Sequence, residues 1–135
     1  MNKLTVKRLN FKTTRYRLEN EDGACLSSLE IDREYMTKAR RELLGFPINE
    51  GVFYLCDFRT TQGERRKGCG RELLNLIKEK TKGQFIYLIV HSTYEDIFPD
   101  DKLVEFYKSV GFKVHEQKDK YKYYTWMVLD NRWII

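Results

Sequence analysis

The sequence predicts an α/β domain with a mixed, largely antiparallel sheet, one parallel strand–helix–strand crossover, and helices on both faces of the sheet. Two nearly continuous apolar runs, Val52–Arg59 and Phe85–Val90, are typical of buried strands. The amphipathic segment between them favours a helix, and a strand–helix–strand connection joins parallel strands. Segments that alternate between apolar and polar residues precede and follow this unit, and they indicate antiparallel neighbours.

The N-terminal part carries the signals of a strand followed by a hairpin. Residues Leu4–Phe11 alternate loosely, which favours a strand. Arg15–Asn20 and Ala24–Ile31 flank a short turn, Glu21–Gly23, whose Asp-Gly pair is a strong hairpin signal. We therefore expect antiparallel strands up to residue 31.

A helix is predicted over Arg33–Leu44, with Asp32 as its N-cap. Its apolar residues recur at roughly helical spacing: Tyr35, Met36, Ala39, Leu43 and Leu44. Gly45 and Pro47 then break the helical pattern before the first buried strand begins.

The second half of the chain is predicted to alternate helices and strands. An amphipathic helix over Arg71–Lys82 ends at Gly83, and another covers Asp100–Val110. Phe112–His115 and Tyr123–Leu129 are expected to close the sheet as a pair of strands.

The composition fits one domain over residues 1–135. The chain is 41% hydrophobic and 14% aromatic, so it can bury a core and is not expected to be disordered. Its three cysteines form no CxxC pair and its two histidines lie far apart, so no metal site is expected. The N-terminus lacks the apolar run of a signal peptide, and no segment has membrane-spanning length. We expect a reduced, cytoplasmic protein.

The charge is mildly basic, with 25 Lys and Arg against 20 Asp and Glu, which suits an anionic ligand or weak nucleic-acid contact. The most basic stretch, Arg65–Arg71 (RRKGCGR), lies between a predicted strand and a predicted helix. Glycines let the backbone approach a ligand closely, and unpaired N–H groups at a helix start attract phosphate oxygens. The alternative is a solvated basic turn whose glycines only allow tight packing.

A second segment, Leu103–Phe112 (LVEFYKSVGF), is a predicted helix that ends at a glycine and continues as a strand. In this order the two segments resemble the GNAT superfamily of acetyl-CoA-dependent N-acetyltransferases. Arg65, Gly68 and Gly70 match that family's R/Q-x-x-G-x-G/A pyrophosphate loop, and Phe106, Tyr107, Gly111 and Phe112 match its common F-Y-x-x-x-G-F segment. The resemblance covers about Val52–Leu129. In size the chain is similar to small acetyltransferases of phages and mobile elements.

The resemblance implies a GNAT-like domain that moves acetyl from acetyl-CoA, the co-substrate, directly to a primary amine. In this family the strand before the loop separates from its neighbour and offers backbone groups to the pantetheine arm, while loop amides hold the pyrophosphate. The implied cofactor-binding residues are Phe58, Arg59 and Thr60 on the strand, and Arg65, Arg66, Lys67, Gly68, Cys69, Gly70 and Arg71 in the loop.

Two residues are candidates for proton transfer. Tyr107 falls where many family members keep a general acid that protonates the leaving thiolate; the alternative is a core aromatic residue with a solvated hydroxyl. Asp57 is the only carboxylate on its strand, and burial among apolar neighbours would suit it as the base, whereas pairing with Arg59 is the alternative. Glu50 is a weaker candidate, and His91 is either an accessory base or a structural histidine.

The acceptor is expected to be cationic, because carboxylates gather beyond the Phe85–Val90 strand. Glu95 and Asp96 are the candidate substrate-binding pair, whereas Asp100 and Asp101 are explained by capping of the next helix. A polyamine, an aminoglycoside-like compound, a lysine side chain or a protein N-terminus would each fit.

Two alternative functions remain open from the sequence. The basic loop and the segment Tyr121–Trp126 could bind nucleic acid, although aromatic residues in strands more often pack a core. A GNAT-like domain could also bind CoA without turnover and act through protein contacts. Many family members line the acceptor side with two helices between the first two strands; here only Phe11–Thr14 lies there, and the helix predicted over Arg33–Leu44 would supply that wall. An exposed edge strand would favour a homodimer.

Overall fold

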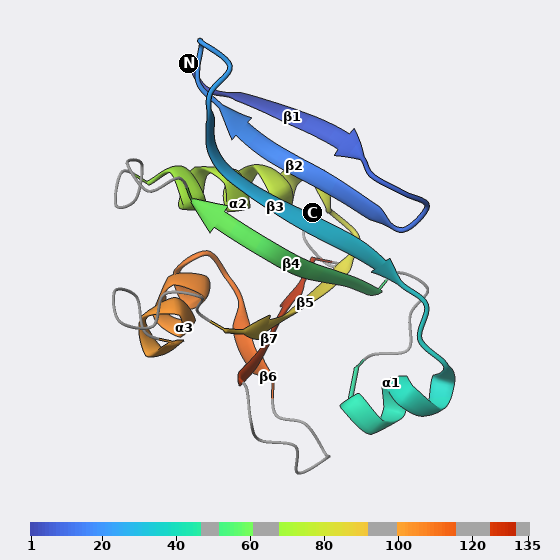
Figure 1. The fold of residues 1–135 in the computed structure, drawn as a ribbon. Coiled ribbons are helices and arrows are strands. Elements are labelled where there is room, and N and C mark those ends of the chain that lie inside the picture. Colours follow the sequence, from blue (N-terminus) through green and yellow to red (C-terminus); the bar gives the residue numbers. More distant parts are fainter. Residues whose placement is uncertain (47–51, 61–67, 92–99, 116–124, 132–135) are drawn as a thin grey trace.

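The computed structural model describes residues 1–46, 52–60, 68–91, 100–115 and 125–131. Within these ranges, one seven-stranded sheet has the order β1-β2-β3-β4-β5-β7-β6 (Figure 1). The strands are β1 (Lys3–Arg8), β2 (Thr13–Glu19), β3 (Cys25–Glu34), β4 (Val52–Thr60), β5 (Phe85–Val90), β6 (Lys113–His115) and β7 (Thr125–Asp130). The helices are α1 (Lys38–Leu44), α2 (Cys69–Lys80) and α3 (Asp100–Ser109). The β4–β5 pair is parallel and the other described pairs are antiparallel, which confirms the predicted mixed sheet.

Helices cover both faces of this sheet, as predicted. On one face the apolar sides of α2 and α3 bury the larger core, in which Leu29, Leu73 and Leu88 are almost completely excluded from solvent. On the other face α1 and Phe46, which follows the helix C-cap Gly45, cover a smaller core that includes Tyr87. Burial of each large apolar side chain contributes about 1.5–3 kcal/mol to folding, so these two cores hold the sheet between its helices.

The predicted helix over Arg33–Leu44 is wrong in its first half. β3 continues to Glu34. Asp32, the expected N-cap, lies within this strand and accepts a hydrogen bond from the Thr13 hydroxyl at 2.7 Å. α1 begins only after Thr37, whose side chain caps the first turn. The apolar spacing favours a helix here, but pairing of β3 with β4 extends the strand instead.

The other predicted elements agree with the structure within a few residues. The first strand, the hairpin that follows it and the closing β6–β7 pair are present, and β5 has the predicted bounds. α2 begins at Cys69 rather than Arg71, and α3 ends at Ser109 rather than Val110. Among the described residues, no helix has the length and apolarity needed to cross a membrane.

A candidate active site where β4 and β5 separate

β4 and β5 pair over a short distance and then separate. Their parallel register runs only from Val52 opposite Phe85 to Tyr54 opposite Tyr87, although β4 continues to Thr60. The two strands diverge toward the left of Figure 1. Beyond Tyr54, the β5 side of β4 has no partner strand in the described part of the chain. Main-chain N–H and C=O groups need partners, so this edge can bind an extended, amide-bearing ligand.

A β-bulge in β4 accompanies the separation. Asp57 has a φ of 53°, the left-handed region that a residue other than glycine seldom adopts. The register with β3 shifts between Ser28 and Glu30, so that Asp57 and Phe58 together occupy the place of one residue. In a regular strand, residues three positions apart point to opposite faces. Because of the bulge, Leu55 and Phe58 both face the larger core. A bulge increases the local twist, which helps to turn β4 away from β5.

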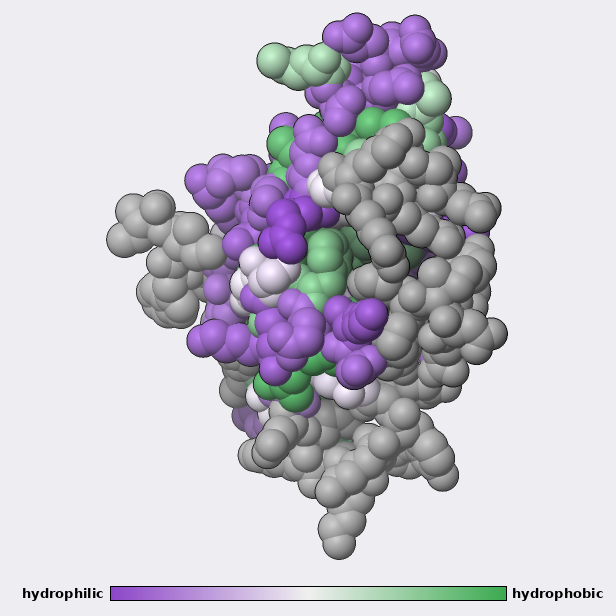
Figure 2. Space-filling model, turned by 90° about the vertical axis from the view of Figure 1, so that its left-hand side faces the viewer, coloured by the Kyte–Doolittle hydropathy of each residue, from purple (hydrophilic) through white to green (hydrophobic). Residues whose placement is uncertain are grey.

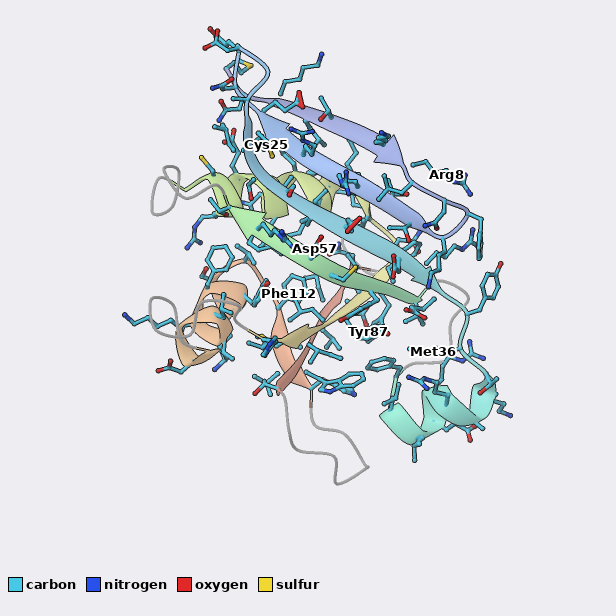
Figure 3. The ribbon with its side chains drawn as sticks, in the orientation of Figure 1. Arg8, Cys25, Met36, Asp57, Tyr87 and Phe112 are labelled. Carbon is cyan, nitrogen blue, oxygen red and sulfur yellow. The ribbon has the colours of Figure 1, made fainter. Side chains whose placement is uncertain are left out.

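The bulge places Asp57 at the surface, so the burial predicted for this carboxylate is wrong. Its side chain is 44% exposed, and its Oδ1 accepts a hydrogen bond from the Arg59 Nε at 2.8 Å. This is the pairing that the sequence left as the alternative. Arg59 is itself 76% exposed, and an ion pair between two exposed side chains contributes at most about 1 kcal/mol. The pair is therefore easily opened by a ligand. Asp57 lies on β4 in Figure 3, beyond the last residue of β4 that pairs with β5.

β4 also differs from the strand predicted over Val52–Arg59, which was expected to be buried on both faces. Only Val52 and Leu55 are buried, Asp57 and Arg59 are exposed, and the other residues are half-buried. Separation from β5 explains the difference, because a strand that loses a neighbour also loses the side chains that cover it.

The start of α2 packs directly against the end of β4. A Cβ atom on Gly70 would lie 3.1 Å from the Phe58 ring and 3.1 Å from the Thr60 hydroxyl oxygen. The Thr60 hydroxyl is in turn 3.2 Å from the Ser27 hydroxyl, so this junction is well fixed. Gly70 is therefore explained by tight packing, which was one of the two interpretations of the loop glycines.

Gly68 has a different role at the same helix. It occupies the N-cap position with a φ of 82° and offers no side-chain cap to the first turn of α2. No atom of the described residues lies within 4 Å of the place where its Cβ would be. A helix start carries partial positive charge, and its first N–H groups have no partner within the helix, so it can bind anions. The N-terminus of α2 is thus suited to a phosphate group beside the end of β4.

The remaining residues of the basic loop are described only in part. Arg65, Arg66 and Lys67 lie outside the described residues. The Cys69 side chain is buried in the larger core. Arg71 is exposed in the first turn of α2, and its guanidinium lies 5.8 Å from the centre of the Phe106 ring on α3. This arginine therefore adds positive charge between α2 and α3. On the side of the molecule that is at the left of Figure 1, hydrophobic surface shows between hydrophilic residues (Figure 2).

Tyr107 lies at the base of the separation, on α3. The centre of its ring is 6.2 Å from that of Phe58 on β4 and 5.6 Å from that of Phe112, and both contacts are edge to face. The residue is only 6% exposed, and burial raises the pKa of its hydroxyl. None of the described residues forms a hydrogen bond with this hydroxyl. Tyr107 is therefore a protonated donor in apolar surroundings, next to the part of β4 that has no partner strand.

The thiol nearest the bulge is kept in its neutral form. Burial, together with the charges of Asp32 and Glu30, raises the pKa of Cys56 to about 12. A thiol is nucleophilic only as the thiolate, so Cys56 is a poor nucleophile near neutral pH.

Several predicted residues are not brought into this site. Glu50, Glu95 and Asp96 lie outside the described residues. His91 is exposed where β5 ends. Trp126 packs in the smaller core, as expected for an aromatic residue in a strand. Within the described ranges, no group of three or more His, Cys, Asp and Glu side chains could hold a metal ion.

Sequence reasoning missed a row of residues on the α1 face of the sheet. Tyr87 stacks on Tyr54 at 4.9 Å and on Trp126 at 5.5 Å. Glu30, Asp32 and Glu34 alternate along the neighbouring β3. Alternation within β3 was a signal for them, but the prediction of a helix beginning at Arg33 concealed it.

Comparison with known proteins identifies the fold. No family model and no curated protein matches the sequence. YlbP, an N-acetyltransferase of Bacillus subtilis in complex with coenzyme A, is similar with a TM-score of 0.60 and 14% identity, over 86% of this chain and 66% of YlbP, just under two thirds of its length. An acetyltransferase of the GNAT family from Staphylococcus aureus Mu50 has a TM-score of 0.55 and 13% identity, over 88% of this chain and 68% of that one. Arabidopsis thaliana Naa50, in complex with the bisubstrate analogue CoA-Ac-MVNAL, has a TM-score of 0.55 and 19% identity, over 84% of this chain and 70% of Naa50.

The chain shares with these acetyltransferases a mixed sheet. In this chain, the parallel strand pair separates beside the start of a helix. Its fold is that of the GNAT acetyltransferases, as the sequence resemblance implied. At identities of 13–19%, this likeness is one of fold.

Proposed function

We propose that this protein is an N-acetyltransferase that moves acetyl from acetyl-CoA to a primary amine by direct transfer. The observation that carries the proposal is the separation of β4 from β5 directly beside the uncapped start of α2. An unpaired strand edge suits an amide-bearing chain, and an uncapped helix start suits a phosphate. Pantetheine pyrophosphate, the arm of coenzyme A, carries both groups in this order.

The residues present fit such a co-substrate. The backbone of Phe58, Arg59 and Thr60 would bind the pantetheine arm as a further strand. The amides of Gly68, Cys69, Gly70 and Arg71 would hold the pyrophosphate, with charge from Arg65, Arg66, Lys67 and Arg71. Acetyl-CoA supplies the acetyl thioester on which the reaction depends.

Tyr107 acts on the leaving group in this proposal. Transfer forms a bond between the acceptor nitrogen and the acetyl carbon and breaks the carbon–sulfur bond. The tyrosine holds its proton because burial raises its pKa, and it donates to the sulfur as negative charge develops there. The same apolar surroundings raise the proton affinity of the departing thiolate, so donor and acceptor remain matched.

Asp57 is the proposed base, directly or through a water molecule. Its exposed carboxylate can accept the proton that the amine must lose, and its ion pair with Arg59 is weak enough to exchange partners. Cys56 is the described thiol nearest this residue, and its raised pKa favours direct transfer over an acetyl-cysteine intermediate.

The acceptor is proposed to be a cationic amine drawn by Glu95 and Asp96. Charge reversal at both positions is expected to lower kcat/KM for a cationic acceptor and to leave the affinity for coenzyme A unchanged. The assignment would be contradicted if the best acceptor were anionic or neutral, or if the charge-reversed variant had the same kcat/KM as the wild type.

The test combines calorimetry with coenzyme A and product detection from labelled acetyl-CoA over a panel of amines. We expect binding and transfer. Arg71→Gln should weaken coenzyme A binding by about 1–3 kcal/mol, the scale of a charge-assisted hydrogen bond, whereas Lys80→Gln in the last turn of the same helix should not. Binding without transfer to any amine would favour a protein that acts through contacts alone. No coenzyme A binding, with nucleic-acid binding that weakens steeply with salt, would favour the nucleic-acid alternative.

A further inference from the structure

One corner of the sheet is formed by the β1–β2 turn and the end of β3, which lie at the same end of the sheet in Figure 1. The Arg33 N–H donates to the Lys12 carbonyl oxygen at 2.8 Å, so the pairing of β2 with β3 continues into the turn. The Arg8 guanidinium donates to the carbonyl oxygens of Asn10 and Phe11 at 3.2 and 3.1 Å, which holds it at the same turn. Arg8 is labelled at this end of the sheet in Figure 3. The hairpin corner is defined here as Arg8, Phe11, Lys12, Arg33 and Tyr35.

Two aromatic side chains of the hairpin corner are exposed to solvent. Phe11 is 81% exposed and Tyr35 is 86% exposed. Every other aromatic side chain within the described ranges is buried or half-buried. A folded chain gains stability by covering such rings, so folding does not explain why both remain at the surface on neighbouring segments.

Three cations accompany these rings without a carboxylate partner. Arg8, Lys12 and Arg33 form no ion pair with any described residue, whereas Arg15, further along β2, pairs with Glu30 at 3.5 Å. Ion pairing therefore neutralises charge in the middle of this part of the sheet and leaves the hairpin corner positive.

The carboxylates nearest to the hairpin corner in the sequence lie on the other face of the sheet. Ile31 faces the larger core, and side chains alternate along a strand, so Arg33 lies on the same face as Ile31. By the same alternation Asp32 and Glu34 lie on the opposite face. Asp32 also accepts a hydrogen bond from the Thr13 hydroxyl at 2.7 Å.

The hairpin corner presents flat rings and positive charge side by side. The Arg33 guanidinium lies 5.8 Å from the centre of the Tyr35 ring, a cation–π contact on one face of this ring. A single-stranded nucleic acid carries a negative phosphate and a flat base in each nucleotide, so it uses both features. A duplex conceals its base faces, an acidic peptide uses only the cations, and a membrane surface needs a broader apolar face.

The hairpin corner also lies away from the proposed site of acetyl transfer. Glu34, which precedes Tyr35, is opposite Val52 at the start of β4, whereas the cofactor residues lie toward Thr60 at its end. The nine residues of β4 span about 26 Å. A ligand at the hairpin corner would therefore not compete with the pyrophosphate of coenzyme A.

We propose that the hairpin corner binds single-stranded nucleic acid. Phe11 and Tyr35 stack on bases, and the three cations Arg8, Lys12 and Arg33 bind phosphates. This binding goes beyond the proposed acetyl transfer and does not depend on it.

The experiment measures the fluorescence anisotropy of labelled oligouridylate and oligothymidylate of about twelve nucleotides, and of a duplex of the same length. We expect both single strands to bind more tightly than the duplex. Phe11→Ala and Tyr35→Ala should each weaken single-strand binding about tenfold, the scale of one lost base stack. Val114→Ala, which shortens an exposed apolar side chain on β6 at the other edge of the sheet, is the matched control and should not change the affinity.

The salt dependence of binding tests the cations. Arg33→Gln should make the slope of log affinity against log salt concentration shallower by about 0.7, the contribution of one phosphate contact with a single strand. Lys113→Gln removes the same charge from an exposed residue of β6 and should leave the slope unchanged. Equal changes for these two variants would mean that only net charge matters, and this result would overturn the proposal.

Other outcomes would overturn the hairpin corner as a nucleic-acid site. One is single-strand binding that Phe11→Ala and Tyr35→Ala leave unchanged, and another is a duplex that binds as tightly as the single strands. Binding of an oligoglutamate peptide or of phosphatidylserine vesicles in place of the oligonucleotides would assign the surface to an acidic protein or to a membrane. Displacement of the oligonucleotide by coenzyme A would place the nucleic acid at the basic loop instead.

The same measurements separate this inference from the proposed function. If no amine is acetylated but the two aromatic variants still weaken oligonucleotide binding, the transferase assignment fails and the hairpin corner stands. If amines are acetylated and no oligonucleotide binds, the hairpin corner is wrong and the reaction stands. Circular dichroism of each variant establishes that it is folded.

Discussion

At the scale of single residues, burial decides which groups of the site can exchange protons. Tyr107 and Cys56 are held in their protonated forms, the first by burial and the second by burial and nearby carboxylates. Asp57 was expected to be buried and is instead exposed by a bulge. No local pattern in the sequence reveals this bulge, because it arises from the register between β3 and β4. The sequence could therefore name Asp57, Phe58 and Tyr107 as candidates, but it could not predict which of them are buried and which is exposed.

Tyr107→Phe tests the residue that the structure places deepest in the site. The change keeps the ring and its edge-to-face contacts, so the free energy of unfolding should change little. Loss of the proton donor should lower kcat by roughly 10²–10⁴-fold, the usual contribution of general acid catalysis. Steady-state rates and urea unfolding of the same preparation measure the two effects. Unchanged turnover would make Tyr107 a purely structural residue.

At the scale of elements, the sequence predicts a strand or helix correctly where local residue pattern decides the structure, and fails where pairing with a distant strand decides it. The Phe85–Val90 strand was predicted with its observed bounds, because its uninterrupted apolar run lies inside the sheet, between β4 and β7, and is buried on both faces. The segment from Arg33 has helical spacing but begins as strand, because Glu34 pairs with Val52 of β4. Such pairing joins residues far apart in sequence and leaves no local trace.

Gly70→Ala tests the packing of α2 against β4, because the tightness of this packing decides whether the substitution raises or lowers the free energy of unfolding. Alanine normally stabilises a helix by up to about 1 kcal/mol relative to glycine. Here the new methyl group would lie 3.1 Å from both Phe58 and Thr60, so we expect a loss of about 1–3 kcal/mol instead, the usual cost of overpacking. Affinity for coenzyme A should fall with it. Thermal unfolding and calorimetry measure both effects, with Asn75→Ala on the exposed side of the helix as control. A more stable Gly70→Ala variant would show that the contact is not tight.

At the scale of the whole molecule, the protein should lose stability in alkaline solution. Burial raises the pKa values of Tyr16, Tyr54, Tyr87 and Tyr107 above the ordinary value of 10. Below pH 10 these tyrosines are protonated in both states. Above it, the unfolded chain releases protons that the folded chain retains, so rising pH favours unfolding. The Cys56 thiol also lowers the free energy of unfolding as the pH rises from about 9 to about 12, because only the unfolded chain releases its proton in this range.

Urea unfolding at about pH 8 and about pH 10.5, followed together with tyrosinate absorbance, measures this loss. Tyr107→Phe should make the decrease shallower, whereas Tyr35→Phe, at a residue that is 86% exposed, should not. A free energy of unfolding that is flat across this range would contradict the predicted linkage.

The short contact between β4 and β5 divides the sheet into two parts, β1 to β4 and β5 with β7 and β6. Among the described residues, these parts are paired only from Val52 to Tyr54. Amide hydrogens in Leu55–Thr60 that point away from β3 should therefore exchange with solvent deuterium much faster than those in the middle of β5. A ligand that fills the separation would supply the missing hydrogen-bond partners and slow the same amides selectively. Exchange measured with and without coenzyme A would reveal this, and equal protection in both states would place the ligand elsewhere. The bound ligand would then take the place of a strand between β4 and β5. With the ligand bound, the two parts of the sheet should unfold together rather than separately.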